Sequence, residues 1–388
     1  MNQGLISLQS HLDGLTDPRD TRKAIHMLSE VLLIALCAML CGAEDFTEFE
    51  HFGKAKEAWL KKIGLQLAGG IPSHDTFRKV FMTLDPKEFR EFFMRWVRSL
   101  LENGIVLGQV AIDGKWLRGS APDGDANSAC KMVNAWSVEA GLAMGQMKVP
   151  EGSNEISAVP ELLNALHLRG CIVTMDAAHC QVKNTQIIIA KKADYVLSAK
   201  ENQATLCEEL ATTFREEAKR NFDKTAHTVH ETMEEGHGRR ECRKCEVITD
   251  PIYIKYHARG NKWKGLSSVV RMTRERWTKK TYEKCTTYYI SSLTVDAKRM
   301  GELIRSHWHS ENKLHWQLDV TFHEDDSRVR TQNAPENLAI LRQMALNVVR
   351  SDKQRPRGIK TMRLAAGWND AYLERLLALA HARPVDHA

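Results

Sequence analysis

The chain has 388 residues, of which 43% are hydrophobic and 27% charged, and its formal net charge is +6. This is an ordinary soluble globular composition, long enough for two or three domains. The longest apolar run, residues 31–41, is too short to cross a bilayer, and no secretory signal precedes it, so we expect no membrane partner. Nine scattered cysteines favour reduced thiols in a cytoplasmic protein.

The first 103 residues have the pattern of a helical domain. Residues 28–43 form an almost wholly apolar helix, and after the Gly-Gly-Ile-Pro break Ser73 is a suitable N-cap for a helix over 74–82. A second helix follows over 87–101. Two short helices across a tight turn are compatible with helix-turn-helix recognition of DNA, although such hairpins are common in helical domains. We predict a DNA-binding helical domain over 1–103.

The middle of the chain changes to a strand pattern. The expected strands cover residues 104–112, 131–138, 142–149, 171–175 and 195–199, and the expected helices cover about 154–166 and 182–192. Three strands, helix, strand, helix, strand is the order of an RNase H-like α/β domain. The predicted fold class is therefore α/β, with a mixed sheet flanked by helices.

Two aspartates follow strands of this domain. Asp113 ends the first strand and Asp176 ends the fourth, and these strands are neighbours in this order, so the two carboxylates should meet at one edge. Either residue alone could be a simple turn former. Two like charges that close are unfavourable without a cation, and such oxygen ligands suit Mg²⁺ or Mn²⁺. Lys115 and Arg118 are placed to contact phosphates.

A third acid lies in an amphipathic pattern near the C-terminus. One helical face, at steps of three or four residues, would carry Met300, Ile304, Trp308, Glu311, His315 and Leu318. An ionised Glu on a buried face needs an ion pair, a hydrogen bond or a cation. Arg305 or Lys313 could supply the ion pair. A cation shared with the two aspartates would explain all three acids together.

Basic residues are concentrated in two places. Residues 239–284 contain fourteen Lys and Arg against five Asp and Glu, interspersed with Tyr253, Tyr256, Trp263, Trp277 and Tyr282. Such a segment is either a surface for polyanions or a solvated face with its aromatic rings turned inward. A second cluster comprises Arg350, Lys353, Arg355, Arg357, Lys360 and Arg363. Together they favour a nucleic-acid partner.

Four motifs in this order resemble those of a known family: AIDGK, TMDAAHCQ, VLSAKENQ and SHWHSENKLHWQLDV. They are similar to the DDE transposases of the H-repeat-associated (ISAs-type) insertion-sequence family, and the likeness covers nearly the whole chain. It implies that Asp113, Asp176 and Glu311 are the catalytic triad and ligands of Mg²⁺ or Mn²⁺. It further implies a core over 104–200, a basic, β-rich insertion over 201–294, and a catalytic helix with a C-terminal helical region over 295–388.

The resemblance also implies partners. These are double-stranded DNA, as transposon ends and target, and a second copy of the chain in synapsis. The residues expected to contact DNA are Lys115, Arg118, Lys200, Gln203, Lys255, Arg259, Lys262, Lys264, Arg305 and Lys313. The expected location is the cytoplasm, on the nucleoid when DNA is bound. A catalytically silent DNA-binding remnant of a mobile element is the alternative function.

The chain departs from the family pattern around Glu311. The tyrosine, arginine and lysine that related transposases place there are replaced by Ile304, His307 and Leu318. Arg305, Lys313 and Arg328 are candidates to take their place. Their roles in binding phosphate therefore stay open.

Other sites are compatible with the sequence. Cys242 and Cys245 are spaced as zinc ligands, but the second pair would have to come from residues such as Cys285 and His257. A helix could bind zinc through His307, Glu311 and His315, which would leave the two aspartates unexplained.

Two further alternatives concern the catalytic residues. Asp319, or one of the acids at 324–326, could replace Glu311 as third metal ligand. A Cys-His hydrolase built on His179 and Cys180 lacks a surrounding nucleophile pattern, and adjacent residues on one loop usually point apart.

Overall fold

The computed structural model describes residues 8–9, 12–20, 22–101, 108–122, 128–150, 152–236, 238–353 and 358–380. The chain forms two compact units. The first comprises Met1–Val106, Gly114–Val149 and Glu311–Ala388, and the second comprises Leu107–Asp113 and Pro150–Ser310. Within the described ranges, no helix is long and apolar enough to cross a membrane.

Apolar and aromatic residues build the N-terminal helices of the first unit. These helices are α2 (Leu28–Leu40), α3 (Phe46–Ala55), α4 (Glu57–Ile63), α5 (His74–Thr83) and α6 (Pro86–Leu101). Every residue of α2 is buried, as its apolar sequence indicates. At the start of α5, Ser73 accepts a hydrogen bond from the amide of Thr76. The predicted N-cap at Ser73 is confirmed.

The first unit also contains a layer of strands packed against a long helix. β1 (Gln109–Leu117) enters this unit at Gly114, and the strand order is β3-β2-β1, with β2 at Cys130–Ser137 and β3 at Leu142–Lys148. α13 (Ala334–Ser351) lies on β3. Its Gln343 donates hydrogen bonds to Asn134 Oδ1 at 2.7 Å and Gln146 Oε1 at 2.8 Å. Because buried amides need partners, these bonds specify how α13 docks on the hairpin. The C-terminal part also contains α12 (Trp316–Thr321), α14 (Ile359–Trp368) and α15 (Asp370–Leu379).

Parallel strands continue the sheet in the second unit. β4 (Ile172–Met175) pairs with β1, and β5 (Asp194–Ala199) pairs with β4, both in parallel. The connecting helices are α7 (Glu155–Ala165) and α8 (Val182–Ala190). The strand order β3-β2-β1-β4-β5 is that of the predicted RNase H-like core. The α/β fold class, with a mixed sheet flanked by helices, is confirmed, although residues 104–107 of the first predicted strand lie outside the described ranges.

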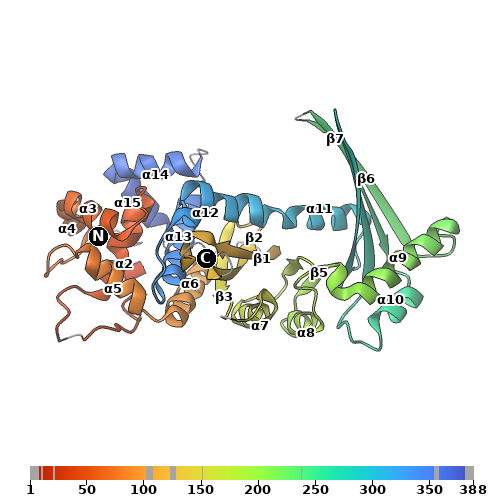
Figure 1. Cartoon of the computed structure of the whole chain (residues 1–388), viewed down its shortest axis with the longest axis horizontal. Coiled ribbons are helices and arrows are strands. Elements are labelled where there is room, and N and C mark those ends of the chain that lie inside the picture. The colour runs from red at the N-terminus through yellow and green to blue at the C-terminus, as the bar shows by residue number, and fades with distance from the viewer. Residues whose placement is uncertain are drawn as a thin grey trace, which may run out of the picture. The chain divides into compact units, whose positions relative to one another are not determined.

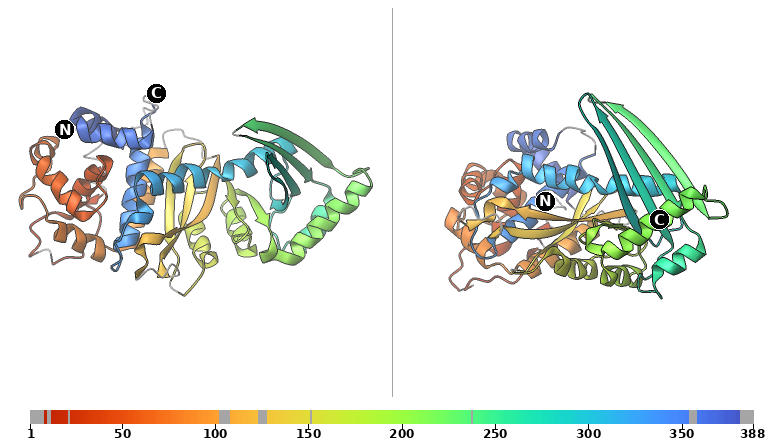
Figure 2. Two further views of the ribbon diagram at one scale, coloured as in Figure 1. Left: turned by 45° about the horizontal axis from the view of Figure 1, so that its top comes forward. Right: turned by 45° about the vertical axis from the view of Figure 1, so that its right-hand side comes forward.

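The insertion lengthens this sheet. It contains α9 (Ala204–Lys219), β6 (His227–Gly236), β7 (Arg239–Ile248), α10 (Pro251–Ala258), β8 (Ser268–Thr278) and β9 (Tyr282–Ser291). β9 pairs antiparallel with β5, and the order continues β9-β8-β7-β6, a long curved sheet in Figures 1 and 2. Phe214 of α9 packs on Tyr288, whereas Tyr289 packs against α11 (Ala297–His307). Since consecutive residues of a strand point to opposite faces, α9 and α11 cover opposite faces.

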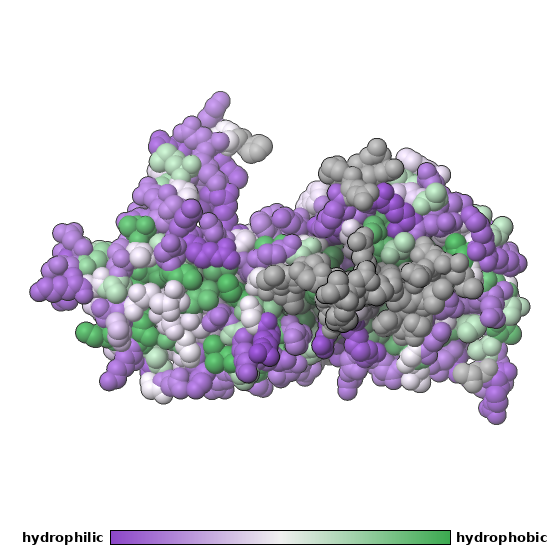
Figure 3. Space-filling view, turned by 180° about the vertical axis from the view of Figure 1, so that it is seen from behind, coloured by the Kyte–Doolittle hydropathy of each residue, from purple (hydrophilic) through white to green (hydrophobic). Residues whose placement is uncertain are grey.

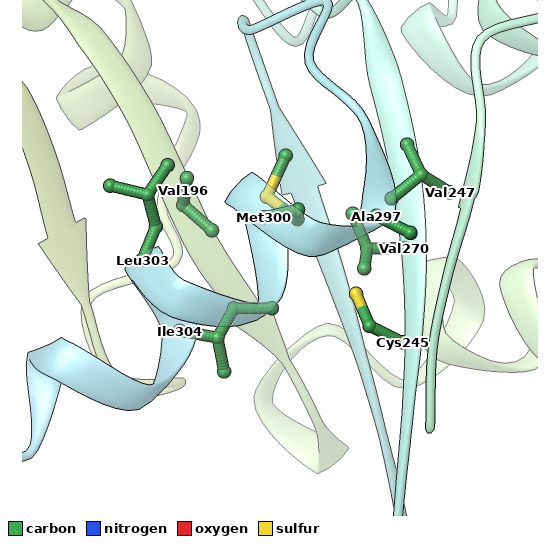
Figure 4. Close-up of a cluster of buried hydrophobic side chains, with 8 residues drawn as sticks. All are labelled: Val196, Cys245, Val247, Val270, Ala297, Met300, Leu303 and Ile304. Atoms are coloured by element: carbon green, nitrogen blue, oxygen red, sulfur yellow. The ribbon is translucent and has the colours of Figure 1, made fainter. Parts of the chain in front are cut away.

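An apolar cluster fixes α11 on the sheet (Figure 4). Met300, Leu303 and Ile304 project from the helix toward Val196 of β5 and Val247 of β7, all within the second unit. These helix residues recur at steps of three and four, as expected for one buried face. The sheet face next to this cluster is the one on which the candidate site lies.

The single long helix expected after Met300 is not formed. α11 ends at His307, a π-helical turn covers Ser310–His315, and α12 starts at Trp316. The wider π turn changes which residues face inward, because it has more residues per turn than an α-helix. Trp308 is 57% exposed, and Glu311 is exposed as well. The prediction of a buried stripe that includes both residues is wrong.

Candidate active site

Two aspartates occupy adjacent positions on neighbouring parallel strands. The register of β1 and β4 places Ile112 opposite Met175, and Asp113 and Asp176 are the next residues of the two chains. Neighbouring strands lie about 4.8 Å apart, and side chains at equivalent positions point to one face. The structure thus brings together the two acids that the strand order predicts to be neighbours.

The surroundings of the two carboxylates differ. Ser310 Oγ lies 3.5 Å from Asp113 Oδ2, and the amide of His179 lies 3.4 Å from Asp176 Oδ1. The side chain of Asp176 is 48% exposed. One expectation needs correction: Asp113 lies inside β1, which continues to Leu117, and does not end the strand.

Glu311 follows Ser310 directly in the chain and belongs to the π-helical turn. Interruptions of this kind occur frequently at functional sites. Arg305, one of the two candidates for an ion pair with Glu311, donates from Nη2 to Glu234 Oε2 at 2.9 Å. Glu311 is itself exposed, so the argument that a buried carboxylate needs a partner no longer applies to it.

Lys115 lies buried among acids of the first unit. It is 7% exposed and pairs with Asp319, and its Nζ lies 3.5 Å from Glu324 Oε2 and 4.0 Å from Asp325 Oδ1. Burial raises the pKa of both Asp319 and Glu324, while Lys115 opposes this effect. Lys115 thus belongs to an internal ionic cluster, which corrects its predicted contact with phosphate. The same cluster engages three of the alternative third metal ligands, Asp319, Glu324 and Asp325, whereas Asp326 Oδ2 lies 3.3 Å from His323 Nδ1.

The chain was compared with known proteins. Residues 106–348 match the model of the transposase DDE domain, and residues 9–97 match the DDE_Tnp_1-associated model. The "H repeat-associated putative transposase YhhI" of Escherichia coli K12 is 35% identical over 96% of this chain and 98% of its own length. This chain belongs to the H-repeat-associated DDE transposases.

Further comparisons agree with the family. The "Putative transposase YncI" of Escherichia coli O157:H7 is 38% identical to this transposase over 96% of this chain and 95% of its own length. A solved piggyBac transposase synaptic complex with hairpin DNA is 11% identical, with a TM-score of 0.42, over 98% of this chain and 80% of that one. This structural likeness is too distant to inform the site.

Most residues predicted to contact DNA are exposed in this transposase, but several have protein partners. Exposed positions are Arg118, Lys200, Lys255, Arg259, Lys262, Lys264, Arg305 and Lys313. Arg259 pairs with Glu209 at 2.7 Å, and Gln203 Nε2 donates to the carbonyl of Cys180 at 3.1 Å. Figure 3 shows hydrophilic residues over much of the visible surface. Lys255, Lys262 and Lys264 are thus exposed predicted residues of the second unit's basic segment.

The second basic cluster is partly internal. Arg363 is 3% exposed, and its guanidinium donates to the carbonyls of Met39 at 2.9 Å and Ala43 at 3.2 Å. Arg350 lies over the ring of Trp136, 4.9 Å from its centroid. Burial lowers the pKa of both arginines to about 10. These two residues stabilise the first unit, so they do not add to the basic surface that favours a nucleic-acid partner; residues 355 and 357 lie outside the described ranges.

The alternative metal sites find no support in the part of the chain that is described. No group of three or more His, Cys, Asp or Glu side chains there is arranged to hold a metal ion, and this holds for Asp113, Asp176 and Glu311 taken together as well as for the alternatives. Cys242 and Cys245 are three residues apart on β7, so they point to opposite faces. Cys242 Sγ contacts Glu231 Oε1 at 3.1 Å, and Cys245 lies in the apolar cluster of Figure 4.

The Cys-His hydrolase is also disfavoured. Cys180 is fully buried, and the pKa of its thiol is raised to about 12, mainly by this burial. The negative charge of Asp176 contributes a smaller part of the increase. A thiol with such a pKa is not a nucleophile near pH 7, because the thiolate is the reactive form.

The sequence interpretation missed a set of polar residues next to the aspartates. Gln109, Thr174, Ser306 and His307 form hydrogen bonds between β1, β4 and α11. Gln109 lies within an apolar strand pattern, and His307 was considered as a zinc ligand and as a departure from the family pattern, not as a partner of Thr174. The available signal was spacing: Gln109 lies four residues before Asp113 and Thr174 two before Asp176, on the same strand faces.

Proposed function

We propose that this transposase binds the ends of its element and cleaves and joins DNA strands through Asp113, Asp176 and Glu311. The observation that carries the proposal is the adjacency of Asp113 and Asp176 across the β1–β4 register. Two neighbouring carboxylates supply the hard oxygen donors that Mg²⁺ or Mn²⁺ prefers, and a cation relieves their repulsion. Glu311 is proposed as the third ligand from its motif and from its place next to Ser310.

The residues fit a divalent metal, which we propose as cofactor. When bound, such ions activate water or a 3′-hydroxyl and stabilise the leaving oxygen in an in-line displacement. Asp113 and Asp176 would hold the metal, and Ser310 would orient the Asp113 carboxylate. Exposed basic side chains would hold the flanking phosphates, and two copies of the chain would bring two DNA ends together.

The test is incubation with Mg²⁺ and DNA that carries the coding sequence with both its flanks. Metal-dependent breaks at fixed positions near the two ends are the expected result. Binding without cleavage under Mg²⁺ and Mn²⁺ would instead support the catalytically silent, DNA-binding remnant.

Neutralising Lys255, Lys262 and Lys264 together as glutamines should weaken DNA binding. Each phosphate contact contributes about 0.9 to the slope of log affinity against log salt, so losing three should flatten the slope by about 2–3. Fluorescence anisotropy across a salt series measures this slope. The control is the triple glutamine variant of Lys219, Arg220 and Lys224, which removes the same charge from the exposed last residue of α9 and the turn that follows it. Equal slopes for the two triple variants would contradict a specific role of Lys255, Lys262 and Lys264 in binding DNA phosphates.

A further inference from the structure

A chain of buried hydrogen bonds lies beside the two aspartates, entirely within the second unit. Gln109 and Thr174 are 1% and 2% exposed, and they share strand faces with Asp113 and Asp176. His307 is the last residue of α11, and its Nδ1 lies 3.0 Å from Thr174 Oγ1. The chemistry of these contacts determines which nitrogen of His307 carries hydrogen.

The hydrogen-bond partners of Gln109 show which of its side-chain atoms is the amide nitrogen. The carbonyl oxygen of Leu303 can only accept a hydrogen bond, so the Gln109 atom 2.9 Å away is the amide nitrogen Nε2. The same nitrogen lies 3.0 Å from Thr174 Oγ1, to which it donates its second hydrogen. Gln109 Oε1 accepts from Ser306 Oγ at 2.5 Å, which agrees with this orientation.

The hydroxyl of Thr174 connects Gln109 to His307. It accepts from Gln109 and still has its own hydrogen to donate. Among the described residues, the acceptor that this hydroxyl reaches is His307 Nδ1, and buried hydroxyls are rarely left unpaired. His307 therefore accepts at Nδ1 and carries its hydrogen on Nε2.

The imidazole ring of His307 is uncharged in this environment. Burial lowers the pKa of His307 to about 4, an effect that Asp176 opposes and His179 reinforces. The imidazole is therefore neutral at pH 7. The ring contacts Thr174, which lies two residues before Asp176 on the same strand face, so His307 lies on the face that carries a proposed metal ligand.

We propose that His307 donates its Nε2 hydrogen to a phosphate oxygen of DNA bound at the site of Asp113 and Asp176. Thr174 and Gln109 are then positioning residues, which fix the tautomer and orientation of this donor. The inference rests on the proposed function, because it requires a phosphate at that site. A neutral donor binds a phosphate oxygen without adding a charge, so it contributes to orientation more than to overall affinity.

The tautomer can be measured without catalysis. Long-range ¹H–¹⁵N spectra of the full chain labelled at histidine nitrogen, at pH 7, should show His307 as the Nε2–H form, identified by its loss in His307→Gln. Thr174→Val should turn this signal into that of mixed tautomers. An Nδ1–H form in the unaltered chain would overturn the inference, and this result does not depend on Thr174→Val folding.

Cleavage by two His307 variants tests the phosphate contact. His307→Ala should slow cleavage about 10²-fold, the usual effect of removing one donor to a reacting group. His307→Gln keeps an N–H near the Nε2 position, so it should cleave at least about tenfold faster than His307→Ala. The salt slope of DNA binding should stay unchanged in both, because a neutral donor releases no counterion. The control is His323→Ala, which removes an exposed histidine of the first unit.

The outcomes separate this inference from the proposed function. If His307→Ala cleaves like the unaltered chain, or if His307→Gln is as slow as His307→Ala, the donor role is wrong. Asp113→Asn is assayed in parallel. An inactive Asp113→Asn together with a fully active His307→Ala overturns only the His307 donor, whereas an active Asp113→Asn overturns the proposed function itself.

Discussion

Replacing Asp113 or Asp176 by asparagine, or Glu311 by glutamine, should abolish strand cleavage, with rates lowered by at least about 10³-fold. The amides keep the shape of the side chains but remove the negative charge that holds a divalent cation. DNA affinity should change less than about threefold, because binding depends mainly on basic side chains and phosphates. Cleavage of labelled DNA ends and anisotropy of the same DNA measure the two quantities separately.

Two controls make this result specific. Asp326→Asn removes an acid whose side chain is 81% exposed, and Glu302→Gln removes an exposed acid of α11. Both variants should cleave normally. Calorimetric titration of Mn²⁺ should show a weaker metal site in Asp113→Asn, Asp176→Asn and Glu311→Gln, and an unchanged site in the two controls. Cleavage at the unaltered rate by all three site variants would refute the proposed chemistry, and an effect confined to the aspartates would remove Glu311 from the site.

The strands that carry the aspartates could be predicted because their signal is local. CIVTM is a short apolar run, and a residue that follows such a run reaches the sheet edge regardless of more distant contacts. The strand order of an RNase H-like core then makes Asp113 and Asp176 neighbours. The pairing of Ile112 with Met175 agrees with that reasoning.

The π-helical turn could not be predicted from periodicity. A count of three and four residues assumes one uninterrupted helix, so it assigned Trp308 and Glu311 to a buried face. Within the turn at Ser310–His315, Ser310 and Leu314 are buried in place of Trp308 and Glu311. In contrast, His315 and Leu318 are buried as the period predicts. The hydrophobicity of the residues does not indicate such a turn, because the turn changes which positions face the core and not which residues are apolar.

A count of charged residues could not predict the exposed basic surface either, because the sequence does not show which charged side chains are buried. Arg363 and Lys255 are equivalent in any charge count, yet Arg363 is buried against main-chain carbonyls and Lys255 is exposed. Only packing distinguishes them. Lys115 is a similar case, since its position after Asp113 indicated a phosphate contact, and its partners lie some two hundred residues later in the chain.

Replacing Lys115 by methionine should destabilise the chain by about 3–5 kcal/mol, the usual cost of removing one partner of a buried ionic cluster. Lys115 and Glu324 are 7% and 2% exposed, so water cannot replace the lost ammonium. The buried Glu324 and Asp319, whose side chain is 32% exposed, would keep their negative charges, and Arg342 Nη1, 3.9 Å from Glu324 Oε1, would be the remaining cation. Thermal melting and urea unfolding at pH 8 measure the loss.

The loss should depend on pH in a defined direction. The folded-state pKa values of Asp319 and Glu324 are already raised above their ordinary values by burial. A carboxyl group with a raised folded pKa gives its full stability below the unfolded pKa of about 4, and this stability is lost as pH rises through the folded value. Without Lys115 the folded pKa values rise further. The deficit of Lys115→Met relative to the unaltered chain should therefore be largest at pH 8 and shrink toward pH 5.

A second substitution separates charge from packing. Adding Asp319→Asn to Lys115→Met removes one of the uncompensated charges, so the double variant should be more stable than Lys115→Met alone at pH 8. Lys61→Met is the matched control, because Lys61 forms an exposed pair with Glu57 at 2.7 Å and should cost less than about 1 kcal/mol. Equal melting temperatures for Lys115→Met and Lys61→Met would show that the cluster contributes nothing to folding. In that case Lys115 would again be a candidate for contact with DNA, since its burial would no longer have a structural purpose.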